Sequence, residues 1–222
     1  MDPFTVSAAV LAIMEKIGMP VNLCLLGMPS SGKTSFALAL QKKLVRKPAP
    51  TKEIIKIKID KRKIDNKNYR ITIYDTSGKK EDHSANIESL LKIVDSVGSQ
   101  LNPFKDFLIM FFCDIKDLFD DNEYKKQVNA RLKHLSSNIN SHLIPRNKVL
   151  LVLTTHNIEK TNNLSEQEKE DQTLLTKKIN ALFIDKEYGD FPKYLLKIRD
   201  EKSVEHLLEY IPQFFPFYHN FT

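Results

Sequence analysis

The 222-residue sequence predicts an α/β protein: a three-layer sandwich whose mostly parallel, six-stranded sheet has one antiparallel edge strand and carries helices on both faces. Three observations predict this fold. Apolar runs of strand length alternate with segments of helical periodicity, which is typical of parallel sheets. Segments 54–59 and 69–74 instead alternate apolar and polar residues, which predicts an antiparallel hairpin. Residues 27–34 form a glycine-bounded loop between a strand and a helix.

The first half of the chain carries three predicted strands and one helix. Residues 21–26 form an apolar run, and residues 33–44 are rich in helix formers and are followed by two prolines that predict the end of the helix. In the hairpin, Ile57 and Ile59 share one face of the first strand while lysines occupy the other, as expected of a half-buried strand. Residues 60–68 are predicted to form a polar turn.

The second half alternates helix and strand. Its predicted elements are, in order, a helix over 83–101, a strand over 107–113, a helix over 122–143, a strand over 149–153, a helix over about 165–184, a strand over 194–198 and a helix over 204–211. The first two of these strands are continuous apolar runs, as expected of strands buried on both faces. The third helix opens with the capping box Ser165-Glu166-Gln167-Glu168.

The composition fits one soluble globular domain over residues 21–222, preceded by a helical extension over 6–20 and by residues 1–5, which look vector-derived. The sequence has no run of 18 apolar residues, so we predict no transmembrane helix. Cys24 and Cys113 lie in apolar strands, and we expect reduced thiols in a cytoplasmic protein, with a disulfide as the alternative. Association with a membrane through a partner or a missing N-terminal segment also stays open.

The net charge of +6 is concentrated in residues 41–80, which hold fourteen lysines and arginines against four acidic residues. Lysines on an edge strand protect it against pairing with other chains. The alternative is a face for an acidic protein partner or an anionic membrane surface. Aromatic residues are not interleaved with these charges and no nucleic-acid motif occurs, so we expect no nucleic-acid partner.

A phosphate-binding motif opens the predicted first helix. Residues 27–34 read Gly-Met-Pro-Ser-Ser-Gly-Lys-Thr, which matches G-x-x-x-x-G-K-T between a strand and a helix. Backbone N–H groups, a helix N-terminus and the ammonium of Lys33 suit a nucleoside triphosphate, and the hydroxyl of Thr34 suits Mg²⁺. The alternative is a chance match in a turn rich in serine and glycine. The predicted phosphate contacts are Gly27, Pro29, Ser30, Ser31, Gly32, Lys33, Thr34 and Ser35.

A second motif, Asp75-Thr76-Ser77-Gly78, ends the second strand of the hairpin. A carboxylate at the end of a strand beside the phosphate loop can hold Mg²⁺ through a water molecule, which is the predicted role of Asp75. Gly78 has no side chain, so its backbone N–H can approach a γ-phosphate.

On these residues, over about 21–211, the chain resembles the Ras-like small GTPases of the P-loop NTPase superfamily. Thr51 lies 24 residues after Gly27 and 24 before Asp75, close to the spacing of the switch I threonine in that family. The resemblance implies binding of GTP or GDP with Mg²⁺ held by Thr34 and Thr51 directly and by Asp75 through water, although Thr51 read alone is also an ordinary loop threonine. It implies catalytic roles for Lys33, Thr51, Gly78 and Lys79.

The segment that reads the base departs from the family. The family has N-K-x-D after the fifth strand, where this chain has Thr154-Thr155-His156-Asn157. Asn157 offers guanine one carbonyl acceptor, whereas a carboxylate would accept both guanine donors. Arg199 stands near the family's S-A-K segment and could stack on the base. Thr155, Asn157 and Arg199 are therefore candidate base contacts, and the guanine preference is implied by the resemblance alone.

Two departures affect hydrolysis and partners. Lys79 stands where the family usually has glutamine, and a lysine side chain is only a donor, so hydrolysis is expected to be slow or to need a partner. His83 is a candidate substitute, with a surface histidine as the simpler interpretation. Pro29 fixes one φ angle of the phosphate loop. The 28 residues between Gly78 and Phe107 exceed a minimal switch II segment, so the switch regions and segment 79–105 are expected to face a protein partner.

The sequence thus favours a Mg²⁺-dependent guanine-nucleotide switch. Two alternatives stay open: a pseudo-GTPase scaffold that binds nucleotide permanently or not at all, and an ATP-binding P-loop enzyme. The order of elements is also comparable to that of the beta subunit of the signal-recognition-particle receptor, but no residue singles out one subfamily.

Overall fold

The computed structural model describes residues 16, 18–42, 54–64, 66–79, 84–89, 92, 107–141, 148–155 and 191–215. Its strands are β1 (Met19–Gly27), β2 (Ile55–Ile64), β3 (Lys67–Asp75), β4 (Phe107–Asp114), β5 (Val149–Thr155) and β6 (Lys193–Lys197). Its helices are α2 (Lys33–Leu40), α4 (Ile115–Asp120), α5 (Asn122–Ser141), α7 (Glu201–Tyr210) and the 3₁₀ helix η3 (Ile211–Phe214), and residues 84–89 are also helical.

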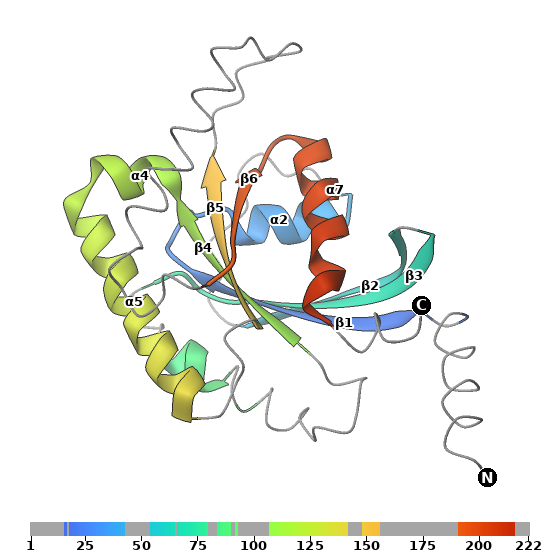
Figure 1. Ribbon diagram of the computed structural model, residues 1–222, viewed down its shortest axis with the longest axis horizontal. Helices are drawn as coiled ribbons and strands as arrows, with labels where there is room; N and C mark the ends of the chain where they lie inside the picture. The colour runs from blue at the N-terminus through green and yellow to red at the C-terminus, as the bar shows by residue number, and fades with distance from the viewer. Residues whose placement is uncertain are drawn as a thin grey trace.

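These strands form one mixed sheet in the order β2-β3-β1-β4-β5-β6 (Figure 1). Strand β1 pairs in parallel with both β3 and β4, and β4-β5 and β5-β6 are also parallel, whereas β2 runs antiparallel to β3. The predicted α/β class and the mostly parallel sheet with an antiparallel pair are therefore confirmed. Ligands of such sheets bind beyond the carboxyl ends of the parallel strands.

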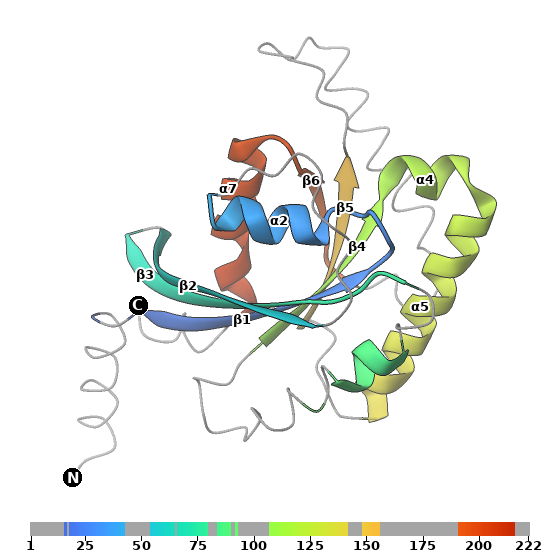
Figure 2. The same ribbon diagram turned by 180° about the vertical axis from the view of Figure 1, so that it is seen from behind.

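Helices cover both faces of the part of the sheet that the structure describes. Successive strand side chains point to opposite faces, so Leu23 and Leu25 of β1 belong to one buried cluster while Cys24 and Leu26 belong to another. Helices α2 and α7 pack on the first face and α5 packs on the second, as Figures 1 and 2 show from opposite sides.

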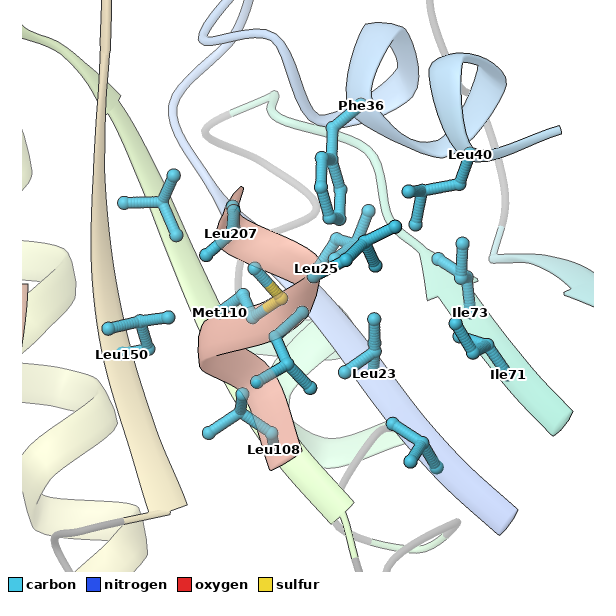
Figure 3. Close-up of a cluster of buried hydrophobic side chains, with 14 of the residues drawn as sticks. Leu23, Leu25, Phe36, Leu40, Ile71, Ile73, Leu108, Met110, Leu150 and Leu207 are labelled. Atoms are coloured by element: carbon cyan, nitrogen blue, oxygen red, sulfur yellow. The ribbon is translucent and has the colours of Figure 1, made fainter. Parts of the chain in front are cut away.

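Figure 3 shows the first cluster at close range. Phe36 and Leu40 of α2 and Leu207 of α7 point toward leucines and isoleucines of β1 and β3 and toward Met110 of β4. Phe36 is fully buried and its ring centroid lies 5.6 Å from that of Phe112. This packing fixes the start of α2, and with it the predicted phosphate loop over residues 27–34, against the centre of the sheet.

The hairpin is tighter than predicted. Residues 60–64 and 67–68 lie in strands, so the predicted polar turn over 60–68 was wrong, and only residues 65 and 66 connect β2 to β3. A register shift between Ile59 and Arg62, as in a β-bulge, lets pairing continue through the polar stretch. Asn66 has φ of 64°, which asparagine tolerates better than most residues.

Several helix boundaries also differ from the prediction. Helix α2 ends at Leu40, not at residue 44, because Lys42 turns into the left-handed region with φ of 57°. Helix α4 was not predicted; the carboxylate of Asp114 caps it by accepting from Lys116 N and Asp117 N. Helix α7 begins three residues before the predicted 204, with Asp200 as its cap.

The remaining predictions are met in part or lie outside the described residues. Helix α5 agrees with the predicted 122–143, and residues 84–89 agree with the start of the helix predicted over 83–101. Residues 1–5, which are predicted to be vector-derived, nearly all of the predicted extension before β1, and the helix predicted over 165–184 lie outside what the structure describes. Within the described part of the chain, no helix is both long and apolar enough to cross a bilayer.

Cys24 and Cys113 are buried on adjacent strands and both thiols are free, as predicted. Burial raises the pKa of each thiol to about 12, and for Cys113 the nearby Asp114 carboxylate contributes as well. Both thiols are therefore inert core groups.

Lys148, just before β5, ties the end of η3 to the sheet. Its ammonium is buried, donates to the Phe214 carbonyl at 2.5 Å, and lies 4.9 Å from the ring centroid of Phe215. We predict that Lys148→Met lowers the free energy of unfolding by about 2 kcal/mol, because that carbonyl loses a charged donor and the ring loses its cation. Chemical denaturation measures this loss, with Lys202→Met on the exposed face of α7 as the control. A change below about 0.5 kcal/mol, as for ordinary surface substitutions, would contradict it.

Candidate functional site

The loop between β1 and α2 leaves the sheet in close contact with β4. Gly27 has φ of 130° and Gly32 has φ of 90°, so both turn through conformations that glycine favours. A Cβ atom on Gly27 would lie 2.1 Å from the Phe112 carbonyl oxygen, and Met28 N donates to that same oxygen at 3.0 Å. The predicted strand, loop and helix context of the motif is thus present, and backbone contacts hold the loop in place.

Lys33 is buried at the start of α2. Its ammonium donates to the Met28 carbonyl at 2.7 Å, and the Ser31 hydroxyl donates to the same carbonyl at 2.7 Å. Burial lowers the pKa of Lys33 to about 8; the Asp75 carboxylate raises it in part, and the guanidinium of Arg131 lowers it further. An anion bound beside this ammonium would favour its charged form.

Thr34 and Asp75, which the sequence predicts as Mg²⁺ ligands, are brought together from elements 41 residues apart. The Thr34 hydroxyl on α2 donates to Oδ2 of Asp75 at the end of β3 at 2.7 Å, and Asp75 is fully buried. A carboxylate beside a hydroxyl supplies the hard oxygen ligands that Mg²⁺ prefers, so this pair fits Mg²⁺. Thr51, the third predicted ligand, lies outside the described residues.

Each residue of the second motif hydrogen-bonds to a different element. The bonds are Thr34 Oγ1 to Asp75 Oδ2 (2.7 Å), Thr76 Oγ1 to Leu25 O of β1 (2.7 Å), Asn86 Nδ2 of the 84–89 helix to Ser77 O (2.9 Å) and Arg131 Nη1 of α5 to Gly78 O (2.9 Å). The segment 75–78 is therefore held from four sides, beside the phosphate loop.

Gly78 packs directly on Pro29 of the phosphate loop. A Cβ atom on Gly78 would lie 2.7 Å from both N and Cα of Pro29 and 2.8 Å from the Met28 carbonyl oxygen. These neighbours are backbone atoms, which cannot rotate away as a flexible side chain can. The absence of a side chain at Gly78 is thus a requirement of the contact between the two motifs.

The side of the site predicted to read the base is described only in part. Thr155 is half-buried at the end of β5, Arg199 is exposed, and Asn157 lies outside the described residues. Thr154, which was not predicted as a site residue, is fully buried and its hydroxyl donates to Ser31 O at 2.9 Å. Ile198 packs on Gly32, where a Cβ atom would lie 3.3 Å from two of its carbons.

The remaining residues near the site are Lys79 and His83, which were considered from the sequence, and Arg131, which was not predicted. Lys79 is exposed, and its backbone N–H donates to the Ser77 hydroxyl at 3.2 Å; His83 lies outside the described residues. Sequence reasoning missed Arg131, whose guanidinium also donates to Gly27 O at 2.9 Å. A signal existed, because Arg131 falls within the apolar stripe of α5 between Val128 and Leu135.

No protein-family model matches the chain, and no curated protein matches its sequence. The contacts among the phosphate loop, the 75–78 segment and Arg131 therefore carry the functional assignment.

We predict that the buried Lys33 ammonium lowers the free energy of unfolding of the protein without ligand. The unfolded chain holds the proton more tightly, so burying the charged form is unfavourable below about pH 8, and this cost disappears as the pH rises toward 10.5. Lys33→Met should raise the free energy of unfolding by about 1 kcal/mol at pH 7, since Ser31 still donates to the Met28 carbonyl. This gain should shrink between pH 8 and 10.5.

Denaturation at several pH values measures this effect, with Lys116→Met on exposed α4 as the control. A variant less stable than the wild type at pH 7, or a gain that grows with pH, would show that the buried ammonium is not unfavourable.

Gly78→Ala is predicted to separate the two motifs. The new methyl group meets backbone of Pro29 and Met28, so the 75–78 segment must move, and we expect a loss of about 1–3 kcal/mol in the free energy of unfolding. Hydrogen exchange should rise at residues 76–79. Glu88→Ala, exposed on the 84–89 helix, is the control, and equal exchange in both variants would contradict the close packing.

Proposed function

We propose that this chain is a Mg²⁺-dependent guanine-nucleotide-binding switch of the Ras-like type, with slow or partner-dependent GTP hydrolysis. The observation that carries the proposal is the 2.7 Å hydrogen bond between Thr34 and Asp75, which joins the phosphate-loop motif and the second motif in one site beside buried Lys33. We also infer that the complete chain is a three-layer sandwich built on a six-stranded sheet.

In this proposal the phosphate chain lies along residues 27–34. Backbone N–H groups and the N-terminus of α2 face it, and the ammonium of Lys33 exchanges the Met28 carbonyl for a phosphate oxygen. Mg²⁺ bound there would neutralise part of the negative charge of the phosphates. Thr34, Asp75 and Thr51 hold the ion, and the Gly78 backbone detects the γ-phosphate.

Hydrolysis is proposed to be slow because Lys79 follows Gly78. An ammonium cannot accept a hydrogen bond from the attacking water, and Lys79 is exposed beside the site. A GTPase reaction of useful rate then needs a group supplied by a partner, which the switch regions and segment 79–105 are proposed to bind. The guanine preference is proposed from the family resemblance, with Thr155, Asn157 and Arg199 at the base.

A second candidate function is a nucleotide-holding scaffold without switching. It is favoured by the four hydrogen bonds that hold segment 75–78 to the protein, since a segment held in this way has less to gain from a γ-phosphate. The two functions differ in whether diphosphate and triphosphate forms have different hydrogen exchange at residues 76–79.

The basic surface of β2 is the proposed face for an acidic partner or an anionic membrane surface. Lys56, Lys58 and Lys63 are exposed there, and the ammonium of Lys56 lies 5.5 Å from the ring centroid of Tyr74 on β3. Repulsion among these charges is relieved by an anionic neighbour. The proposed location is cytoplasmic, with membrane association through such a face or a partner.

Titration of the purified protein with fluorescent GTP, GDP and ATP, with and without Mg²⁺, tests the function. We expect Mg²⁺-dependent binding of GTP and GDP, ATP binding at least about tenfold weaker, equivalent to 1.4 kcal/mol, and single-turnover hydrolysis that is barely detectable. Thr34→Val should remove the Mg²⁺ dependence, whereas Thr72→Val in the middle of β3 should not.

Tighter binding of ATP would favour an ATP-binding P-loop enzyme, and absence of binding would favour a scaffold without nucleotide. Lys33→Met should abolish binding of every nucleotide, so it confirms the site without separating these functions.

A further inference from the structure

Arg131 is a buried charged residue on α5. The two hydrogen bonds that its Nη1 atom donates both go to residues outside that helix. Arg131 is 5% exposed, and Nη1 donates to Gly27 O and to Gly78 O, each at 2.9 Å. A buried guanidinium is costly unless it is hydrogen-bonded, so these two bonds offset part of the cost of burying this charge.

The two carbonyls that Arg131 joins belong to the two motifs of the site. Gly27 is the last residue of β1 and begins the phosphate loop, and Gly78 ends the second motif 51 residues later. One guanidinium nitrogen bridges them at the same distance. Arg131 therefore fixes the separation between the phosphate loop and Gly78, in addition to the direct packing of Gly78 on Pro29.

The charge of Arg131 also acts on the site. It lowers the pKa of Lys33, so the two cations are close enough to repel each other, while the Asp75 carboxylate acts on Lys33 in the opposite direction and more strongly. Phosphate oxygens placed at the loop would offset the excess of positive charge. Arg131 thus contributes to the site without needing to touch a bound nucleotide.

We propose that Arg131 is a positioning residue that couples α5 to the nucleotide site, by holding the Gly78 backbone at the distance from the phosphate loop at which a γ-phosphate is preferred over a diphosphate. This inference rests on the proposed function. Nη1 of the planar guanidinium carries two fixed N–H donors and can serve both carbonyls while staying buried, whereas the lysine side chain is one bond shorter, so its ammonium does not reach the position of Nη1. A shift of α5 would act on both carbonyls through the same nitrogen atom.

The coupling is tested first by hydrogen exchange in the protein without nucleotide. Arg131→Lys keeps the charge but falls short of the position from which Nη1 bridges the two carbonyls, and Arg131→Ala removes both the charge and the bridge. We expect exchange of residues 76–79 to rise at least about tenfold in both variants, with exchange of β5 unchanged. Lys133→Ala, two residues away on the exposed face of α5, should match the wild type.

The nucleotide preference is tested by the ratio of the dissociation constants for GDP and a non-hydrolysable GTP analogue. We expect this ratio to fall at least about fivefold in Arg131→Lys. If Arg131→Ala does not fold, Arg131→Lys alone decides. Equal losses of affinity for both nucleotides, or unchanged exchange at residues 76–79, would reduce Arg131 to a structural role and overturn the proposal.

Nucleotide titration of the wild-type protein distinguishes a failure of the proposed function from a failure of the role of Arg131. Wild-type protein that binds neither nucleotide would overturn the proposed function and the triphosphate preference with it. Normal wild-type binding with an unchanged ratio in the variants would overturn only the role of Arg131.

Discussion

Parallel pairing of β1 with β3 sets Leu25 opposite Asp75, and this register determines where the site forms. Both strands end at the same edge of the sheet, so the phosphate loop and the second motif leave it side by side. A shift of one residue would turn Asp75 to the other face and separate its carboxylate from Thr34. The contacts of Lys33, Gly78 and Arg131 all presuppose this register.

Hydrogen bonds from side chains to backbone carbonyls then hold the loops at that edge. Thr76, Thr154 and Arg131 donate to carbonyls of β1 and of the phosphate loop, and none of the three is exposed to solvent by more than 5%. Buried donors and acceptors that lose a partner are costly, so the loops resist independent movement. Any switching must exchange these bonds for others, as the exchange of the Met28 carbonyl for a phosphate would do at Lys33.

Local sequence patterns predicted much of the fold and of the site. What they could not predict are contacts between residues that lie far apart in the sequence. Periodicity predicted the strands because each has a buried face, but residues 60–68 are mostly polar and the strand pairing shifts register between Ile59 and Arg62, so the sequence pattern there indicated a turn. The motifs at 27–34 and 75–78 are contiguous and were predicted. Arg131 and Thr154 act across 104 and 123 residues on Gly27 and Ser31. The apolar stripe of α5 indicates that Arg131 is buried, but no local pattern shows which distant carbonyl either side chain contacts.

The buried thiols have a practical consequence for following the loops in solution. The chain has two cysteines, and burial keeps both thiols protonated at neutral pH by raising their pKa. Maleimide dyes react with thiolate, so a single cysteine introduced at an exposed position would be labelled selectively in the otherwise unchanged sequence. Loop motions can then be recorded by fluorescence without replacing either core residue.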